Sequence, residues 1–258
     1  MKITTLLLLV LLSSCAHKTA STAPRASSET MMNDIPVDIV LDHGPFKIMY
    51  NTDKRLPEYV AYELTADHLK AREGKRANKF IIDPILMEQN LPYVAPSEYA
   101  KSGYDRGHMA PSGDFLWDQN LNDMTFVMSN MAPQSPNLNR DSWRKLEDQV
   151  RRWACGEGKL MVITGPVLTE GLPKMRSGLV IPQKFFKIII DETPPKKVIS
   201  FLYDQGDHGD MLAKNTVPLK DIEKETKVVF TENFPDLKNE KVRLPADENT
   251  WKEADCEN

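Results

Sequence analysis

A dense group of ionisable residues marks the stretch Asp105-Arg106-Gly107-His108. Hydrolysis of a phosphodiester needs a base that deprotonates water and a cation that neutralises charge developing on the phosphate, and a metal ion often assists both. His108 and Arg106 are residues of these two types, and the glycine between them suggests a turn. Taken singly, they also fit a plainer interpretation, with a structural Asp105–Arg106 ion pair and a hydrogen-bonded turn histidine.

A second polar group lies further along the chain, where Asn139, Trp143, Glu147 and Arg151 recur at intervals of four residues. At 3.6 residues per turn, this spacing places them in one row along a helix. An amide oxygen and a carboxylate that face one site are hard ligands, which together with water suit magnesium better than zinc. Asn139 on its own also fits the simpler role of a helix cap.

The elements that must position these groups follow from the spacing of apolar residues. A helix is predicted over 141–155, where apolar residues recur at helical intervals, and shorter helices are predicted near Lys70 and Lys220. Strands are predicted where β-branched and aromatic residues gather, at 37–41, 46–50, 59–64, 124–129, 160–164, 179–181, 185–190 and 198–203. Meandering strands with one strong helix indicate an α+β fold rather than regular βαβ alternation.

Together, the two polar groups resemble the DNA/RNA non-specific endonuclease family. The likeness rests on Asp105-Arg106-Gly107-His108, on the segment 130–139, which ends 31 positions after His108, and on Glu147. It extends over about residues 60–203. The resemblance implies the ββα-metal, or His-Me finger, fold, with a central, mainly antiparallel sheet flanked by helices.

The resemblance also implies a role for each site residue. His108 would be the general base, and Asn139 the direct protein ligand of one Mg²⁺ ion, with Mn²⁺ as a substitute. Because an ordinary histidine titrates near ~6.5, activity is expected to fall below that pH. The other implied site residues are charged: Glu147 holding a metal-bound water, Arg106 and Arg151 facing the phosphate, Arg76 as a further phosphate contact, and Asp105 supporting the local geometry.

The resemblance predicts an endonuclease that hydrolyses DNA and RNA to products with 5′-phosphates. One alternative is a catalytically silent envelope protein that captures nucleic acid on the same scaffold, and another is a phosphodiesterase acting on small nucleotides. Intact His108, Asn139 and Glu147 favour the enzyme, because binding alone needs neither a base nor a metal ligand. The net charge of −4 gives no basic global field, so phosphate-binding groups must gather locally.

The N-terminus has the pattern of an export signal. Lys2 precedes an apolar run over residues 6–12, which is too short to span a bilayer. The run ends in Leu12-Ser13-Ser14-Cys15, which resembles the lipobox of bacterial lipoproteins and predicts a lipid anchor on Cys15. We therefore expect a signal peptide at 1–14, a flexible tether at 15–34 and an endonuclease domain at 35–258. The expected location is the cell envelope, at the outer membrane or facing the periplasm, with secretion as the alternative.

Two cysteines remain after Cys15 is set aside, Cys155 and Cys256. An even pair in an exported protein favours a disulfide between them. Two unpaired thiols are the alternative, since spacing alone does not supply the geometry of a bridge.

Overall fold

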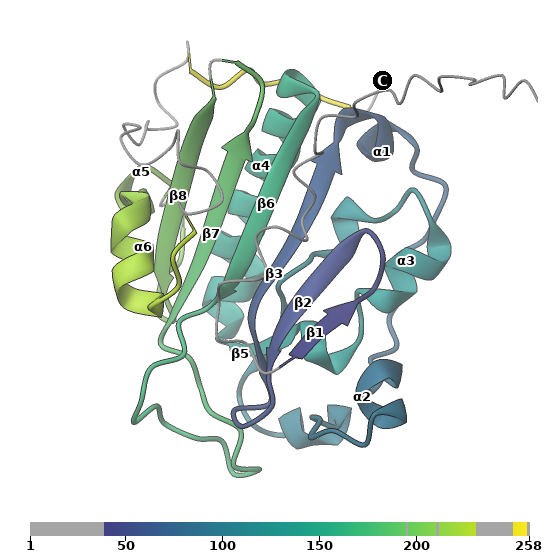
Figure 1. Cartoon of the computed structure of the whole chain (residues 1–258), viewed down its shortest axis with the longest axis vertical. Helices are drawn as coiled ribbons and strands as arrows, with labels where there is room; N and C mark the ends of the chain where they lie inside the picture. The colour runs from purple at the N-terminus through teal and green to yellow at the C-terminus, as the bar shows by residue number, and fades with distance from the viewer. Residues whose placement is uncertain (1–38, 195, 210–211, 231–249, 257–258) are drawn as a thin grey trace, which may run out of the picture.

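A six-stranded sheet forms the centre of the computed structural model, which describes residues 39–194, 196–209, 212–230 and 250–256. The strand order is β1-β2-β3-β6-β7-β8, and every neighbouring pair is antiparallel (Figure 1). The strands of this sheet are β1 (Ile39–Asp42), β2 (Phe46–Asn51), β3 (Leu56–Thr65), β6 (Lys159–Pro166), β7 (Lys184–Asp191) and β8 (Lys197–Asp204).

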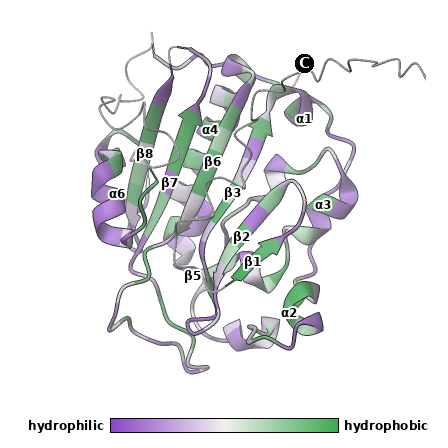
Figure 2. Ribbon diagram, in the orientation of Figure 1, coloured by the Kyte–Doolittle hydropathy of each residue, from purple (hydrophilic) through white to green (hydrophobic). Residues whose placement is uncertain are grey.

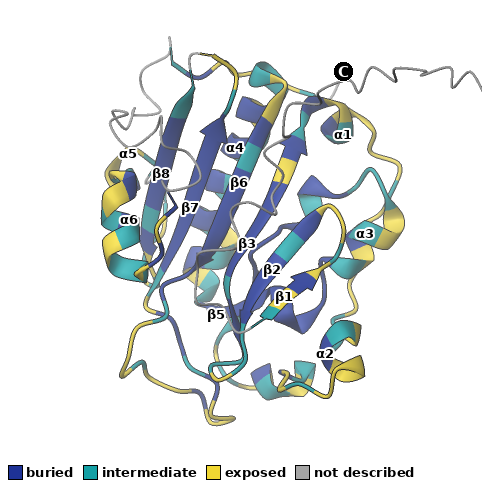
Figure 3. Cartoon of the chain, viewed as in Figure 1, coloured by how far each residue is buried: buried dark blue, intermediate teal, exposed yellow. Residues whose placement is uncertain are grey.

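Most residues of the sheet are buried (Figure 3), and many of them are apolar (Figure 2). Side chains that alternate along β3 and β7 belong to two separate cores, one under α4 and one under α6. The helices are α1 (Ala66–Lys70), α2 (Pro84–Glu88), α3 (Gln119–Met124), α4 (Trp143–Glu157), α5 (Leu212–Asn215) and α6 (Leu219–Thr226). None of the helices described is long and apolar enough to cross a membrane.

A second, two-stranded sheet packs on the same core as the main sheet and carries the motif residues. β4 (Asp105–His108) pairs antiparallel with β5 (Met131–Gln134), so that Asp105 lies opposite Gln134 and His108 opposite Met131. A π-helical turn, Leu138–Ser142, then leads into α4. The order of strand, strand and helix is the ββα arrangement that the resemblance implies.

The far end of α4 is tied to the C-terminal part of the chain. The helix ends at Gly158, whose φ of 89° suits glycine. A disulfide joins Cys155 to Cys256 with 5.7 Å between the Cα atoms. Trp251 packs against Trp153, with ring centroids 5.4 Å apart. The predicted signal, tether and lipidated Cys15 lie outside the described residues.

Most of the predicted elements are present, but two of the predicted strands are wrong. Residues 124–129 form the end of α3 and the 3-10 turn Met128–Asn130. Residues 179–181 contribute only the isolated bridge between Lys174 and Val180. Both runs are apolar because they fill the core under α4, and a short buried run has the same composition in a turn as in a strand.

Candidate active site

A pocket of about 450 Å³ opens between β4, the N-terminal turns of α4 and the segment before α2. It brings together residues that are far apart in sequence, including residues of both predicted motifs. Of the predicted site residues, it contains Arg76, Asp105, Arg106, His108, Asn139 and Glu147.

His108 lines this pocket and has an unpartnered ring nitrogen. The residue is only 8% exposed, and its Nε2 has no hydrogen-bond partner among the described residues. Its ring packs edge-on against Phe126, with centroids 4.7 Å apart, and lies 5.9 Å from Phe80. Burial and the nearby positive charge of Arg76 lower the pKa of His108 to about 3. The imidazole is therefore neutral at ordinary pH and able to accept a proton.

Asp105 joins the strand that carries His108 to the start of α4. Its carboxylate accepts hydrogen bonds from Asn139 Nδ2 at 3.0 Å and from Arg140 Nε and Nη2 at 2.7 and 2.6 Å. Although burial opposes ionisation, these donors hold the pKa of Asp105 below its usual range. Since Nδ2 points at Asp105, Oδ1 of the same Asn139 amide points away and is the atom offered to a cation.

Glu147 lies two helical turns beyond Asn139 and faces the same pocket. Burial raises the pKa of its carboxyl group, and the nearby Lys187 and Arg151 offset only part of this effect. Lys187 is itself buried on β7, with Nζ 4.9 Å from the centre of the Trp143 ring. Trp143, which stands between Asn139 and Glu147 in the helix row, is apolar and packs on the sheet.

The donor set of the pocket fits a hydrated metal ion. Within the described ranges, no group of three or more His, Cys, Asp or Glu side chains is arranged to hold a metal. Asn139 Oδ1 and the Glu147 carboxylate are oxygen donors on the helix side of the pocket. Such a site suits an ion that keeps most of its waters, as Mg²⁺ does, rather than one enclosed by protein ligands.

Two cations lie against aromatic rings at the rim of the pocket. The guanidinium of Arg106 lies 4.7 Å from the Phe80 ring and 5.6 Å from the Tyr99 ring, and it donates to Pro96 O at 2.8 Å. That of Arg76 lies 5.1 Å over the Phe126 ring. Stacking leaves N–H groups at the guanidinium edge to meet an anion.

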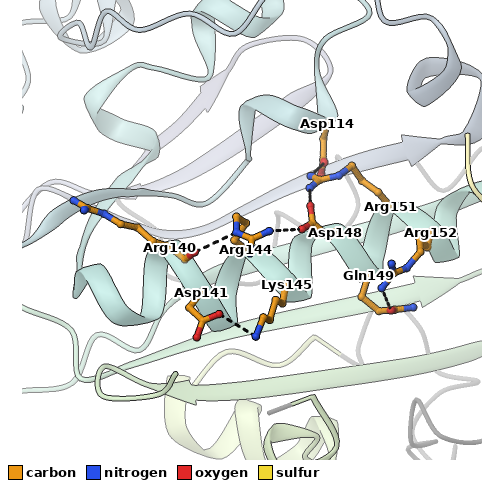
Figure 4. Close-up of polar contacts among 9 residues, drawn as sticks. All are labelled: Asp114, Arg140, Asp141, Arg144, Lys145, Asp148, Gln149, Arg151 and Arg152. Carbon is orange, nitrogen blue, oxygen red and sulfur yellow. Dashed lines mark hydrogen bonds and ion pairs between the residues drawn. The ribbon is translucent and has the colours of Figure 1, made fainter. Parts of the chain in front are cut away.

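Arg151 does not join the pocket, and its placement departs from the predicted row. Its guanidinium donates to Asp114 at 2.8 Å and also to Asp148 (Figure 4). The physical reason is helix geometry: a step of four residues overshoots one turn by about 40°, so three steps turn the side chain about 120° away from Asn139. The π-helical turn at Leu138–Ser142 alters the phase further.

Two arginines that the sequence analysis did not assign to the site, Arg140 and Arg144, also line the pocket. Arg140 and Arg144 form a ladder along α4, in which Arg144 donates to Arg140 O at 3.1 Å and to Asp148 at 2.9 Å (Figure 4). Neither arginine stands at the four-residue interval of the predicted row, so that pattern carried no signal for them.

Fold and site together place the chain in a known family. The family model for DNA/RNA non-specific endonucleases matches residues 26–237, and the chain belongs to that family. The predicted fold class is thereby confirmed. A crystal structure of the EndoG/EndoGI complex contains a chain similar to this one, with a TM-score of 0.71 and 26% identity, covering 83% of this chain and 94% of the other.

The relatives are nucleases from distant organisms. A nuclease from Nostoc sp. is 34% identical over 155 residues, which cover 60% of this chain and 55% of the relative. Human mitochondrial endonuclease G is 31% identical over 204 residues, which cover 73% of this chain and 68% of the relative. The chain thus spans about half the length of the Nostoc nuclease.

Proposed function

We propose that this chain is an exported, magnesium-dependent endonuclease that hydrolyses DNA and RNA with little sequence preference. The observation that carries the proposal is the unpartnered Nε2 of a neutral His108, held in the same pocket as Asn139 and Glu147. Membership of the endonuclease family supports the reaction class.

In this mechanism, His108 Nε2 accepts the proton of a water molecule whose oxygen attacks phosphorus. The bond from phosphorus to the 3′ oxygen breaks, and that oxygen takes a proton from solvent water, which leaves a 3′-hydroxyl and a 5′-phosphate. Arg76 and Arg106 neutralise negative charge on the phosphate oxygens. Asn139 Oδ1 would hold the Mg²⁺ ion directly and Glu147 would hold one of its waters. When bound, the ion supplies stabilisation for charge that builds on the leaving oxygen.

Little sequence preference follows from the chemistry of the pocket. The cations at its rim are suited to phosphate oxygens, which are identical at every position of DNA and RNA. Asp105 supports the site by holding the Asn139 amide in its orientation, while Arg151 belongs to the ion pairs beneath α4 rather than to the phosphate contacts.

Plasmid and RNA cleavage by the purified chain, with Mg²⁺ and with a chelator, tests the proposal. His108→Ala should lower the rate about 10²- to 10⁴-fold, the usual worth of a general base. Asn139→Ala should be comparably damaging, because it removes the only proposed direct ligand. Glu147→Ala should be milder, since it acts through water. Cleavage at the parent rate by folded His108→Ala or Asn139→Ala protein contradicts the assigned roles, and full activity in the chelator contradicts the metal.

Export and lipid anchoring at Cys15 belong to the same proposal and rest on the N-terminal sequence. A single acyl chain binds membranes only marginally, whereas several chains on one cysteine anchor firmly. Cys15→Ser should therefore release the protein from membranes or block its processing. Mass spectrometry of the mature N-terminus provides the test, and an unmodified N-terminus at another residue would rule out the anchor.

A further inference from the structure

A basic strap, residues 71–80, runs beside the pocket without regular secondary structure. It contains four basic residues and one acidic residue, although the whole chain is acidic. All four basic residues, Arg72, Lys75, Arg76 and Lys79, are exposed. The strap therefore concentrates positive charge where the net charge of the protein does not provide it.

The strap is held in place by hydrogen bonds to α3 and the turn before it. Gly74 N donates to Leu116 O at 2.7 Å, and the Gln119 amide both accepts from Lys75 N at 2.9 Å and donates to Lys75 O at 3.0 Å. The buried Asn122 accepts from Ala77 N at 2.9 Å.

Asn122 also fixes the strap relative to the pocket. Its Nδ2 donates to the backbone oxygen and to Oγ of Ser112, at 2.8 and 2.9 Å, and Ser112 lines the pocket. The strap backbone is thus ordered before any ligand arrives, and binding to it needs little further ordering.

The charges of the strap differ from those on the opposite wall. In the π-helical turn before α4, Arg140 pairs with Asp105, and on α4 Arg144 pairs with Asp148, so carboxylates offset both guanidinium groups. Lys75 and Lys79 form no ion pair with another residue of the described ranges. An anion that approaches the strap therefore meets uncompensated charge.

Position along the chain links the two lysines to the site. Arg76 and Phe80 line the pocket, and Lys75 and Lys79 are the residues immediately before them. Four residues of extended chain span at most about 14 Å. That length corresponds to about four phosphates along one strand of a duplex, at about 3.4 Å of axial rise each.

We infer that Lys75 and Lys79 bind backbone phosphates that flank the cleaved one, so that the strap holds a DNA or RNA strand across the pocket. The inference rests on the proposed function, because it takes nucleic acid as the ligand. Lysine ammonium groups bind phosphate as point charges. Contacts of this kind position the strand without reading its sequence.

Salt dependence of binding tests the strap directly. In a His108→Ala background of the full chain, which stops cleavage, fluorescence anisotropy would give the Kd for a 20-base-pair duplex at several NaCl concentrations. Each phosphate contact contributes about 0.9 to the slope of log Kd against log salt concentration. Lys75→Gln/Lys79→Gln should therefore lower that slope by about 1.8 and raise Kd about tenfold to a hundredfold at 0.1 M salt.

The matched control is Lys220→Gln/Lys224→Gln on α6, which removes two exposed lysines from the opposite face of the sheet. The control should keep the parent slope. An unchanged slope in the strap variant, or an equal fall in both variants, overturns the inference. The inference is also overturned if the strap variant loses binding to vesicles of phosphatidylglycerol and phosphatidylcholine while its duplex slope stays unchanged. The strap would then be a membrane contact. This experiment measures binding and not cleavage. If the parent chain proved inactive but the slopes were as expected, the proposed nuclease activity would be refuted and the inference on the strap would stand.

Discussion

The most informative prediction concerns the protonation of His108. Burial against Phe126 and the charge of Arg76 lower its pKa from about 6.5 to about 3, so the imidazolium is destabilised in the fold by roughly 5 kcal/mol. The acid limb of the pH-activity profile that belongs to this base should thus lie far below pH 6.5, where an unperturbed histidine would place it. Arg76→Gln should move that limb upward, because it removes the charge that repels the proton.

The same shift makes a prediction about stability. Because the folded-state pKa of His108 is depressed, the unfolded chain binds this proton first as the pH falls. The contribution of His108 to the free energy of unfolding is therefore complete above about pH 6.5, and it is lost progressively as the pH falls towards 3. From pH 7 to pH 4, the free energy of unfolding of the parent should fall by about 3 kcal/mol because of this group. His108→Ala has no such group and should not show this fall. The difference in the free energy of unfolding between the two proteins should change by that amount from pH 7 to pH 4.

Urea unfolding of both proteins at pH 7 and pH 4 provides the assay, and NMR of the His108 ring protons reports its titration directly. Subtraction of the two proteins cancels every other group that titrates equally in both. A ring titration centred near pH 6.5, or a stability difference that is the same at both pH values, would refute the reasoning.

Three substitutions test the packing around the site. Gly107→Ala would place a Cβ 2.1 Å from Oε1 of the buried Gln134. Urea unfolding should show that the free energy of unfolding falls by about 1–3 kcal/mol. If adding Gln134→Ala did not restore stability, this cause would be contradicted. Cys256→Ser opens a loop of 101 residues and should lower the free energy of unfolding by up to about 4 kcal/mol. Equal melting temperatures of parent and variant would exclude a contribution of the disulfide to stability. Arg151→Gln removes the ion-pair partner of the buried Asp114, which keeps its hydrogen bond from Tyr62, so the free energy of unfolding should fall by about 2 kcal/mol. A fall in the salt slope of DNA binding by this variant would return Arg151 to the phosphate contacts.

Sequence patterns predicted the main sheet well because its strands are long and both faces are buried. The strands β2, β3, β6, β7 and β8 all occupy runs rich in β-branched and aromatic residues. The failures at 124–129 and 179–181 share a different property. In those segments the apolar side chains fill a core from irregular backbone, and the backbone hydrogen bonds that distinguish a strand depend on partners that are remote in sequence.

At the site, residue types were easier to predict than orientations. His108 and Asn139 meet in one pocket as the motif spacing suggested, although the motif lies on a strand rather than in a turn. Arg151 was misplaced because a row at intervals of four drifts around a helix. Arg140 was overlooked because its contact with Asp105 crosses 35 positions of sequence, and local patterning carries no information on such pairs.

The carboxylate of Asp105 has a consequence for how this protein can change over evolution. It binds the Asn139 amide directly, so this contact and the pairing of β4 with β5 together fix the distance between His108 and Asn139. Within the intervening chain, residues 109–138, β5 contributes to this distance through its pairing with β4, and α3 lies outside that pairing. Insertions in its exposed part around α3 should therefore be tolerated without altering the catalytic spacing, so chain length there is free to diverge while the site keeps its dimensions.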